Sequence, residues 1–312
     1  MVSVSKHSYL PGEKTSVMIS KCNDTLKIVG KSKAILGEGP VWDEASDTLY
    51  WVDIKGKALH VHIPKIDVDR CINLPIEVGA VAPRVGGGLI AATRNGFAFL
   101  DPQNGMLDQI EDPEAEYPNN RFNDGTIDHL GNFIAGTMHD LETEKTGTVY
   151  CLESSGGVKP LFGGYVICNG PAFSPDGCTL YFSNSSEREI LAFPYDAGVR
   201  DVGKPKLFTK ITEAYGYPDG LAVDQEGCVW CALWDGGGVT RFSPQGDFLQ
   251  FFALPVPHVT CCAFGGSDYE QLYITTASWG LSEAQMQESP LSGSLFVVTP
   301  GVRGMPSRAF LG

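Results

Sequence analysis

Residues 169–184 read NGPAFSPDGCTLYFSN, and this stretch contains the pattern that decides the fold. An apolar run leads into Ser174, a short turn closes at Gly177, and a second apolar, β-rich run follows. A Ser or Asp at the start of such a turn caps it through its side chain, and Gly takes the positive φ that the turn needs. The stretch therefore predicts two antiparallel strands joined by a tight hairpin.

The same pattern recurs at residues 38–53 (EGPVWDEASDTLYWVD), 123–138 (NDGTIDHLGNFIAGTM) and 219–234 (DGLAVDQEGCVWCALW). A further unit fits residues 78–102 (VGAVAPRVGGGLIAATRNGFAFLDP), and a last one begins at residue 259 with VTCCAFGG and ends with GSLFVVTP. Six units of 40–50 residues, each with several short strands, are typical of a β-propeller. We predict an all-β, six-bladed β-propeller in a single domain over residues 21–312, preceded by a loose extension at residues 1–20. Residues 25–36 (TLKIVGKSKAIL) are expected to supply an outer strand that closes the ring.

Composition narrows the class of partner. The 312 residues include 37 glycines and 20 prolines, which break helices and argue against a helical repeat. A net charge of −14, with no basic stripe, makes nucleic acid and anionic membrane surfaces poor partners. The nine cysteines are an odd number, and the first residues lack the apolar core of a secretory leader. We expect free thiols in a reducing cytoplasm and a small neutral molecule or a cation as partner.

Four polar residues hold one register at the start of the first strand of their units: Glu38, Asn123, Asn169 and Asp219. The first strand of each propeller blade lines the central channel, so these side chains should converge on the axis. Two carboxylates and an amide oxygen are ligands that suit hard divalent cations such as Ca²⁺, Mg²⁺ or Mn²⁺. The alternative interpretation is that Asn and Asp before Gly are ordinary turn residues.

At these residues the chain resembles the SMP-30/gluconolactonase/LRE family. The matching motifs run in family order over nearly the whole chain: GEGPVWD, NNRFNDGTIDHLGNFIAGTM, NGPAFSPDG, YPDGLAVDQEG, ALWDGGGVTRFSPQG and PVPHVTCCAFGG. Within the family, GTMHD and the ALW to RFSPQG region look most like bacterial aldonolactonases of the xylonolactonase kind. The resemblance implies a six-bladed propeller with one catalytic divalent metal on Glu38, Asn169 and Asp219. It also implies that Arg121 and Asn123 contact the substrate.

Two positions depart from the family pattern, and one is Asn184, where the fourth blade of the family usually ends its second strand with Asp. The other lies after the GTM motif. Some members carry a substrate-binding Glu shortly after GTM, where this chain has Leu141 in the run GTMHDLETE. His139, Asp140 or Glu142 are the residues that could take its place. Two other histidines, His60 and His62, lie on a strand-like outer run and are expected to face solvent.

The implied reaction is hydrolysis of a pentono- or hexono-lactone to its aldonic acid by a carboxylic ester hydrolase. Asp219 is the candidate base for a metal-activated water, and the metal could be Ca²⁺, Mg²⁺, Mn²⁺, Zn²⁺ or Fe(II). No G-x-S-x-G elbow is present, which disfavours a serine hydrolase. The alternatives are a non-enzymatic Ca²⁺-binding regulatory propeller and a related esterase acting on aryl esters or organophosphates. The chain is expected to act as a monomer or a small homo-oligomer.

Overall fold

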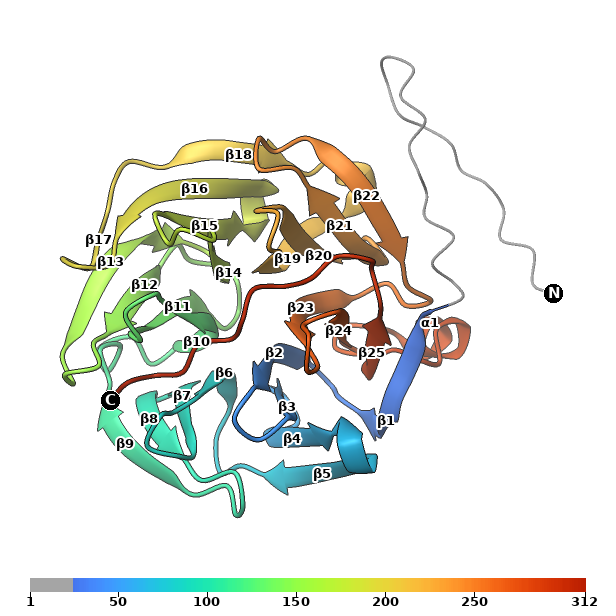
Figure 1. The fold of residues 1–312 in the computed structure, drawn as a ribbon, viewed down its shortest axis with the longest axis horizontal. Coiled ribbons are helices and arrows are strands. Elements are labelled where there is room, and N and C mark those ends of the chain that lie inside the picture. Colours follow the sequence, from blue (N-terminus) through green and yellow to red (C-terminus); the bar gives the residue numbers. More distant parts are fainter. Residues whose placement is uncertain (1–24) are drawn as a thin grey trace.

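The computed structural model describes residues 25–312, and the extension expected at residues 1–20 lies outside them. Six antiparallel sheets are arranged around a central axis, which confirms the six-bladed propeller (Figure 1). We number the blades in chain order from the sheet that begins at β2. Blade 1 contains β2 (Gly37–Asp43), β3 (Thr48–Asp53), β4 (Ala58–Ile63) and β5 (Val68–Asn73). Blade 2 contains β6 (Val78–Pro83), β7 (Leu89–Thr93), β8 (Gly96–Leu100) and β9 (Leu107–Glu111), and blade 3 contains β10 (Asn120–Ile127), β11 (Phe133–His139), β12 (Gly147–Leu152) and β13 (Val158–Tyr165).

The remaining three blades complete the ring. Blade 4 contains β14 (Cys168–Phe173), β15 (Thr179–Asn184), β16 (Glu189–Asp196) and, both paired to β16, the short β17 (Asp201–Val202) and β18 (Lys206–Lys210). Blade 5 contains β19 (Tyr217–Val223), β20 (Val229–Trp234), β21 (Gly238–Phe242) and β22 (Phe248–Ala253). Blade 6 contains β23 (Val259–Gly265), β24 (Gln271–Thr276), β25 (Ser294–Val298) and β1 (Lys27–Lys33). Because β1 pairs with β25, the two ends of the propeller are held in one sheet, as the alternation in residues 25–36 predicted.

The hairpin turns form as the repeated pattern predicted. In blade 3, the Asp128 carboxylate accepts the backbone N–H of Leu130 and of Asn132, each at 2.9 Å, and Gly131 has a φ of 76°. Asp128 is fully buried and also accepts a hydrogen bond of 2.7 Å from the Tyr195 hydroxyl of blade 4. The turn residue therefore also ties neighbouring blades together.

Apolar side chains fill the space between adjacent blades. One cluster joins blades 2 and 3, where the Phe97 and Phe122 rings lie 4.6 Å apart between centroids. A second joins blades 3 and 4, where Phe162 stacks on Phe193 at 4.2 Å. Similar clusters occupy the other interfaces. Each blade thus buries both faces against its neighbours, which holds the inner strands rigidly around the axis.

The inner strand of every blade carries a shift in register against the second strand, the signature of a β-bulge. In blades 1 and 4 the bulge contains Gly39, with φ 50°, and Gly170, with φ 58°, a conformation that favours glycine. A bulge bends a strand and redirects its side chains. These bulges lie at the register of the four polar residues that the repeats place on the axis.

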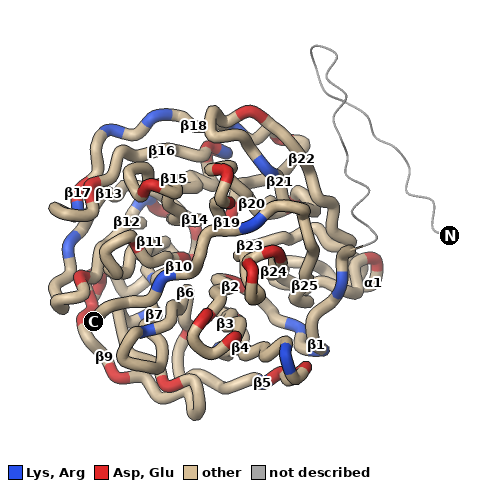
Figure 2. Tube along the Cα trace, viewed as in Figure 1, with Lys and Arg blue, Asp and Glu red and all other residues tan. Residues whose placement is uncertain are grey.

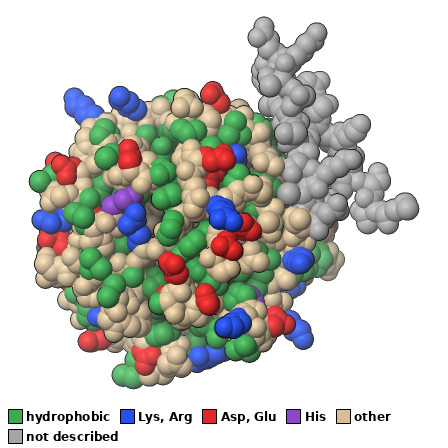
Figure 3. Space-filling model, viewed as in Figure 1, with side chains coloured by type: hydrophobic (Ala, Val, Ile, Leu, Met, Phe, Trp, Pro, Cys, Tyr) green, Lys and Arg blue, Asp and Glu red, His purple; other side chains and the backbone are tan. Residues whose placement is uncertain are grey.

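The C-terminal segment, residues 299–312, crosses one end of the central channel (Figure 1). Backbone hydrogen bonds fasten it to the turns of several blades, including Gly304 N–H to the Tyr269 carbonyl and Leu311 N–H to the Gly131 carbonyl. Under it lies a cavity of about 180 Å³, lined by the inner strands and by residues 305–308. Figure 3 shows hydrophobic side chains gathered around the centre of this face.

Short helical segments connect some of the strands. They are the helix α1 (Glu283–Glu288) and the 3₁₀ turns η2 (Pro64–Ile66), η3 (Ser185–Glu187) and η4 (Glu213–Tyr215). Lys and Arg positions are scattered around the ring rather than gathered in one stretch (Figure 2). Within residues 25–312 no helix has the length and apolar character needed to span a membrane.

The expectation that His60 and His62 face solvent is wrong. Both are buried, because β4 is covered by the outermost strand β5 and by neighbouring aromatic rings. His60 stacks on Trp51 at 3.9 Å between ring centroids, and the His62 Nδ1 lies 2.9 Å from an Asp69 oxygen.

Candidate functional site

The four polar residues of the shared register are brought together at the axis, at the end of the channel away from the C-terminal segment. Each is buried, with 5% of Glu38 and 6% each of Asn123, Asn169 and Asp219 exposed. They come from blades 1, 3, 4 and 5, and the same register falls on apolar Val78 in blade 2. A side chain from each of these four blades reaches the axis because the inner strands bulge there.

A chain of hydrogen bonds fixes the orientation of the two amides. Asn123 Nδ2 donates to Asn169 Oδ1 and, at 3.2 Å, to the Cys168 carbonyl. Asn169 Nδ2 donates to the Ser185 hydroxyl at 3.0 Å, and that hydroxyl donates to the Pro218 carbonyl at 2.6 Å. Because the Asn169 Nδ2 donates to Ser185, its amide oxygen is presented on the side where Asn123 lies.

The carboxylates of the site repel one another. Burial raises the pKa of Glu38 well above its usual range, and the charges of Asp219 and Asp124 raise it further. Burial likewise raises the pKa of Asp219, and Asp124 and Glu142 add to the effect. The pKa of Asp124 is raised by burial to about 6, although the backbone N–H groups of Gly170 and Gly125 hydrogen bond to it. The axis thus concentrates negative charge in a place shielded from water.

This donor set fits a divalent cation. Glu38 and Asp219 are buried carboxylates whose hydrogen bonds come from the backbone N–H groups of Gly39 and Gly220. A bound cation would neutralise them, and the amide oxygen of Asn169 would add a third hard ligand. In the described part of the chain, no group of three His, Cys, Asp or Glu side chains is arranged to hold a metal. The candidate set is therefore two carboxylates and one amide, as the family resemblance implies.

Asp124 lies beside this set and differs in its bonding. Its Oδ1 accepts the Gly125 N–H at 2.7 Å and its Oδ2 accepts the Gly170 N–H at 2.8 Å. It therefore braces the bulge of blade 4 from blade 3. Asp124 also lines the cavity under the C-terminal segment.

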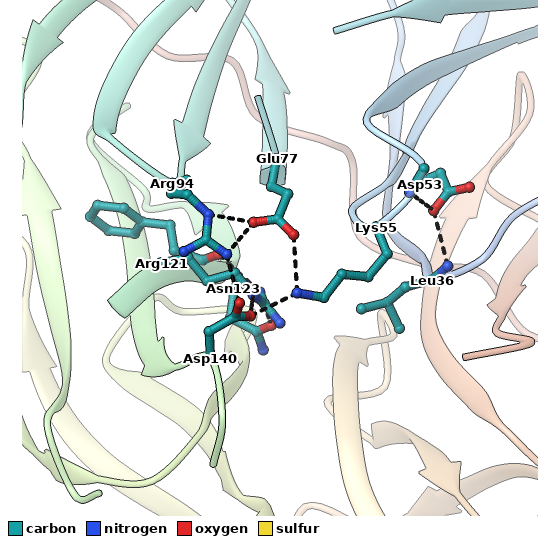
Figure 4. Close-up of polar contacts among 10 residues, drawn as sticks. Leu36, Asp53, Lys55, Glu77, Arg94, Arg121, Asn123 and Asp140 are labelled. Atoms are coloured by element: carbon teal, nitrogen blue, oxygen red, sulfur yellow. Dashed lines mark hydrogen bonds and ion pairs between the residues drawn. The ribbon is translucent and has the colours of Figure 1, made fainter. Parts of the chain in front are cut away.

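Arg121 lies next to Asn123, as their i and i+2 spacing predicts. Only 4% of its side chain is exposed, and its Nη1 donates to Asn123 Oδ1 at 2.7 Å. Its Nε donates to Asp140 Oδ1 at 2.7 Å. Asp140 in turn binds Lys55 and Arg94, so Arg121 belongs to a charged cluster rather than to an isolated surface ion pair (Figure 4).

The three residues that could replace the family glutamate differ in burial and in hydrogen-bond partners. His139 is buried at the end of β11, with its Nδ1 3.2 Å from the Thr143 hydroxyl of its own loop. Glu142 is exposed, and its charge acts on Asp219. Asp140 is the one whose carboxylate binds Arg121. Leu141 projects outward, with 73% of its surface exposed.

Sequence reasoning missed the charged cluster that contains Arg121. Its members Lys55, Arg94 and Asp140 follow the second strands of blades 1, 2 and 3, while Glu77 precedes the first strand of blade 2. A signal was available, because Arg94 and Asp140 are each the first residue after a second strand. Their contact across blades depends on how the blades pack, which no local pattern reveals.

These observations define a class: a six-bladed propeller with a cluster of buried oxygen donors on its axis. The chain belongs to the SMP-30/Gluconolactonase/LRE-like family, whose model matches residues 36–278. It is similar to a 6-deoxy-6-sulfogluconolactonase of Pseudomonas putida, with 34% identity covering 93% of this chain and 100% of that protein. It is also similar to regucalcin of Xenopus laevis, with 34% identity covering 89% of this chain and 95% of that protein.

A solved structure has the same architecture over most of its length. The calcium-binding protein regucalcin of Agrobacterium tumefaciens superposes with a TM-score of 0.87 at 30% sequence identity. The match covers 91% of this chain and 96% of that one. The similarity to these relatives therefore extends over nearly the whole propeller.

Proposed function

We propose that the protein is a metal-dependent sugar lactonase that hydrolyses a pentono- or hexono-lactone to the aldonic acid. The observation that carries the proposal is the meeting of Glu38, Asp219 and Asn169 at the axis, with Arg121 and Asn123 beside them. The relative from Pseudomonas putida, named for its action on a sulfonated gluconolactone, supports a sugar lactone as substrate.

Glu38, Asn169 and Asp219 have distinct roles in the proposed reaction. Glu38, Asn169 and Asp219 would hold a divalent cation, which when bound polarises a carbonyl and makes a water more acidic. Asp219, beside that water, accepts its proton as the general base. The water oxygen bonds to the lactone carbonyl carbon, the ring C–O bond breaks, and the released alkoxide takes up a proton.

Arg121 and Asn123 bind and orient the sugar. The guanidinium donates to oxygen atoms of the lactone and stabilises negative charge that develops on the carbonyl oxygen. Asn123 is already oriented by its bonds to Arg121 and Asn169. The charged and amide groups of Arg121 and Asn123 favour a polyhydroxylated substrate over the apolar substrates of an aryl esterase.

The test is hydrolysis of a panel of pentono- and hexono-lactones by purified protein, before and after chelation and re-addition of Ca²⁺, Mg²⁺, Mn²⁺, Zn²⁺ or Fe(II). We expect turnover that chelation removes and at least one cation restores. Asp219→Ala should abolish turnover while its circular dichroism spectrum stays that of the wild type.

Failure to exceed spontaneous hydrolysis with every lactone and cation would remove the proposal. Tight Ca²⁺ binding without turnover would instead favour a regulatory calcium-binding propeller, an outcome to which the regucalcin relatives point. Full activity in Asp219→Ala would exclude Asp219 from the site.

A further inference from the structure

We propose that Asp140 is a positioning residue that orients the Arg121 guanidinium toward the lactone, and that Lys55 and Arg94 hold Asp140 in place. The inference rests on the proposed lactonase function and adds residues from blades 1, 2 and 3 to it. Asp140, in the loop after the GTM motif, thus acts on the substrate through Arg121 and does not contact it directly.

The hydrogen bonds of Arg121 leave one nitrogen available. Nε donates to Asp140 Oδ1 at 2.7 Å, and Nη1 donates to Asn123 Oδ1 at 2.7 Å and to the Phe122 carbonyl at 3.1 Å. Among residues 25–312, Nη2 has no protein acceptor. Because the guanidinium is planar, fixing Nε and Nη1 also fixes the direction of the two Nη2 hydrogens. Nη2 is therefore the donor that remains for a ligand.

Asp140 is itself held by two further cations. Lys55 Nζ donates to Asp140 Oδ1 at 2.8 Å, and Arg94 Nη2 donates to Oδ2 at 2.7 Å (Figure 4). Lys55 also binds Glu77 Oε1 at 3.0 Å, and Arg94 binds the same carboxylate. Burial alone would raise the pKa of Asp140, but hydrogen bonds from Lys55, Arg121 and Arg94 outweigh it and lower the pKa well below its usual range. The carboxylate therefore stays ionised and bound on both oxygens.

The cluster contains three cations and two carboxylates, so one positive charge remains uncompensated within it. The Arg121 charge acts on Glu38 and partly offsets the rise in its pKa that burial and the neighbouring carboxylates cause. Without Asp140, the guanidinium would lose its Nε partner and be attracted to the axial carboxylates. Asp140 therefore keeps Arg121 beside the axial carboxylates, with Nη2 exposed to the ligand, instead of letting it pair with them.

A double-mutant cycle distinguishes positioning from structural support. The variants are Asp140→Asn, Arg121→Met and their combination, with kcat and KM for the lactone that the wild type hydrolyses fastest. We expect Asp140→Asn and Arg121→Met each to lower kcat/KM at least tenfold. In the Arg121→Met background, Asp140→Asn should change kcat/KM by less than twofold, because its effect passes through Arg121.

The matched control is Glu187→Gln, which removes an exposed carboxylate whose ion pair, 3.4 Å long, is to Lys145. Its kcat/KM should stay within twofold of the wild type. If Asp140→Asn does not fold, Lys55→Met replaces it in the cycle, because it removes a support of Asp140 while leaving the Arg121 pair. That variant should show a smaller loss that again vanishes in the Arg121→Met background.

Two results would overturn the inference while leaving the lactonase proposal intact: Asp140→Asn within twofold of an active wild type, or a loss that multiplies unchanged with that of Arg121→Met. The second result would indicate structural support by Asp140, and a matching fall in melting temperature would accompany it. A wild type that hydrolyses no lactone would overturn both proposals together.

Discussion

In protein stripped of divalent cations, the free energy of unfolding should fall as the pH rises from 5 to 7.5. A carboxyl whose pKa is raised by folding binds protons more tightly in the folded state, so stability falls as the pH rises through the folded pKa. Asp124 has a pKa of about 6, against 3.8 for an ordinary Asp. At 1.36 kcal/mol for each pKa unit, its ionisation costs the folded protein about 3 kcal/mol. About half of that loss falls between pH 5 and 7.5.

Glu38 and Asp219 act in the same direction, because burial and mutual repulsion raise the pKa of both. The carboxyls with lowered pKa, Asp140 and Glu77, have their effect below about pH 5, outside this window. We therefore expect the free energy of unfolding to fall by at least about 1.5 kcal/mol, or the melting temperature by roughly 2–3 °C. Urea unfolding of chelator-treated protein, followed by tryptophan fluorescence, measures this fall.

The matched comparison is Asp219→Asn, also stripped of metal, which removes one of the interacting carboxyls. Its fall over the same pH range should be smaller than that of the wild type. Burial lowers the pKa of His60, which opposes the trend below pH 6.5, but this contribution is common to both proteins and cancels. A saturating divalent cation should abolish the fall, because a bound cation keeps the carboxylates ionised. A stripped wild type whose stability is flat or rises over this range, with the same profile in Asp219→Asn, would refute the reasoning.

Two further predictions concern parts that support the site. Ser185→Ala removes the acceptor for Asn169 Nδ2 and should weaken divalent cation binding at least tenfold by calorimetry; unchanged affinity would mean that this bond does not orient the amide. Phe310→Ala, in the C-terminal segment and 2% exposed, should cost about 3–5 kcal/mol of unfolding free energy. A loss under about 1 kcal/mol would show that the segment contributes little to closing the channel.

The fold was predictable because its signals are local. The turn at Asp128 and Gly131 is specified by residues adjacent in sequence, and the repetition of such turns gives the number of blades. The axial register followed from the same repeats, since a residue five positions before the turn lies at one height in each blade. The prediction for His60 failed because burial there depends on Trp51 and on the strand β5 that follows.

The charged cluster around Arg121 was not predictable in the same way. The spacing of Arg121 and Asn123 predicted that their side chains share one face, and the hydrogen bond between these two residues agrees with that prediction. The ion pair between Arg121 and Asp140 joins residues of one blade. Lys55 and Arg94, however, reach Asp140 from two other blades. Such contacts depend on the angle and separation of packed sheets, which no pattern in a single stretch of sequence encodes.

The central claim is that lactone hydrolysis requires one divalent cation held by the axial carboxylates. The most direct measurement titrates metal-free protein with Mn²⁺ and follows lactone hydrolysis and bound metal in the same samples. We predict that activity rises in proportion to bound Mn²⁺ and levels off at one equivalent per chain, and that Glu38→Gln neither binds the first equivalent tightly nor gains activity. Full activity in the metal-free protein, or activity in Glu38→Gln equal to that of the wild type, would contradict the claim.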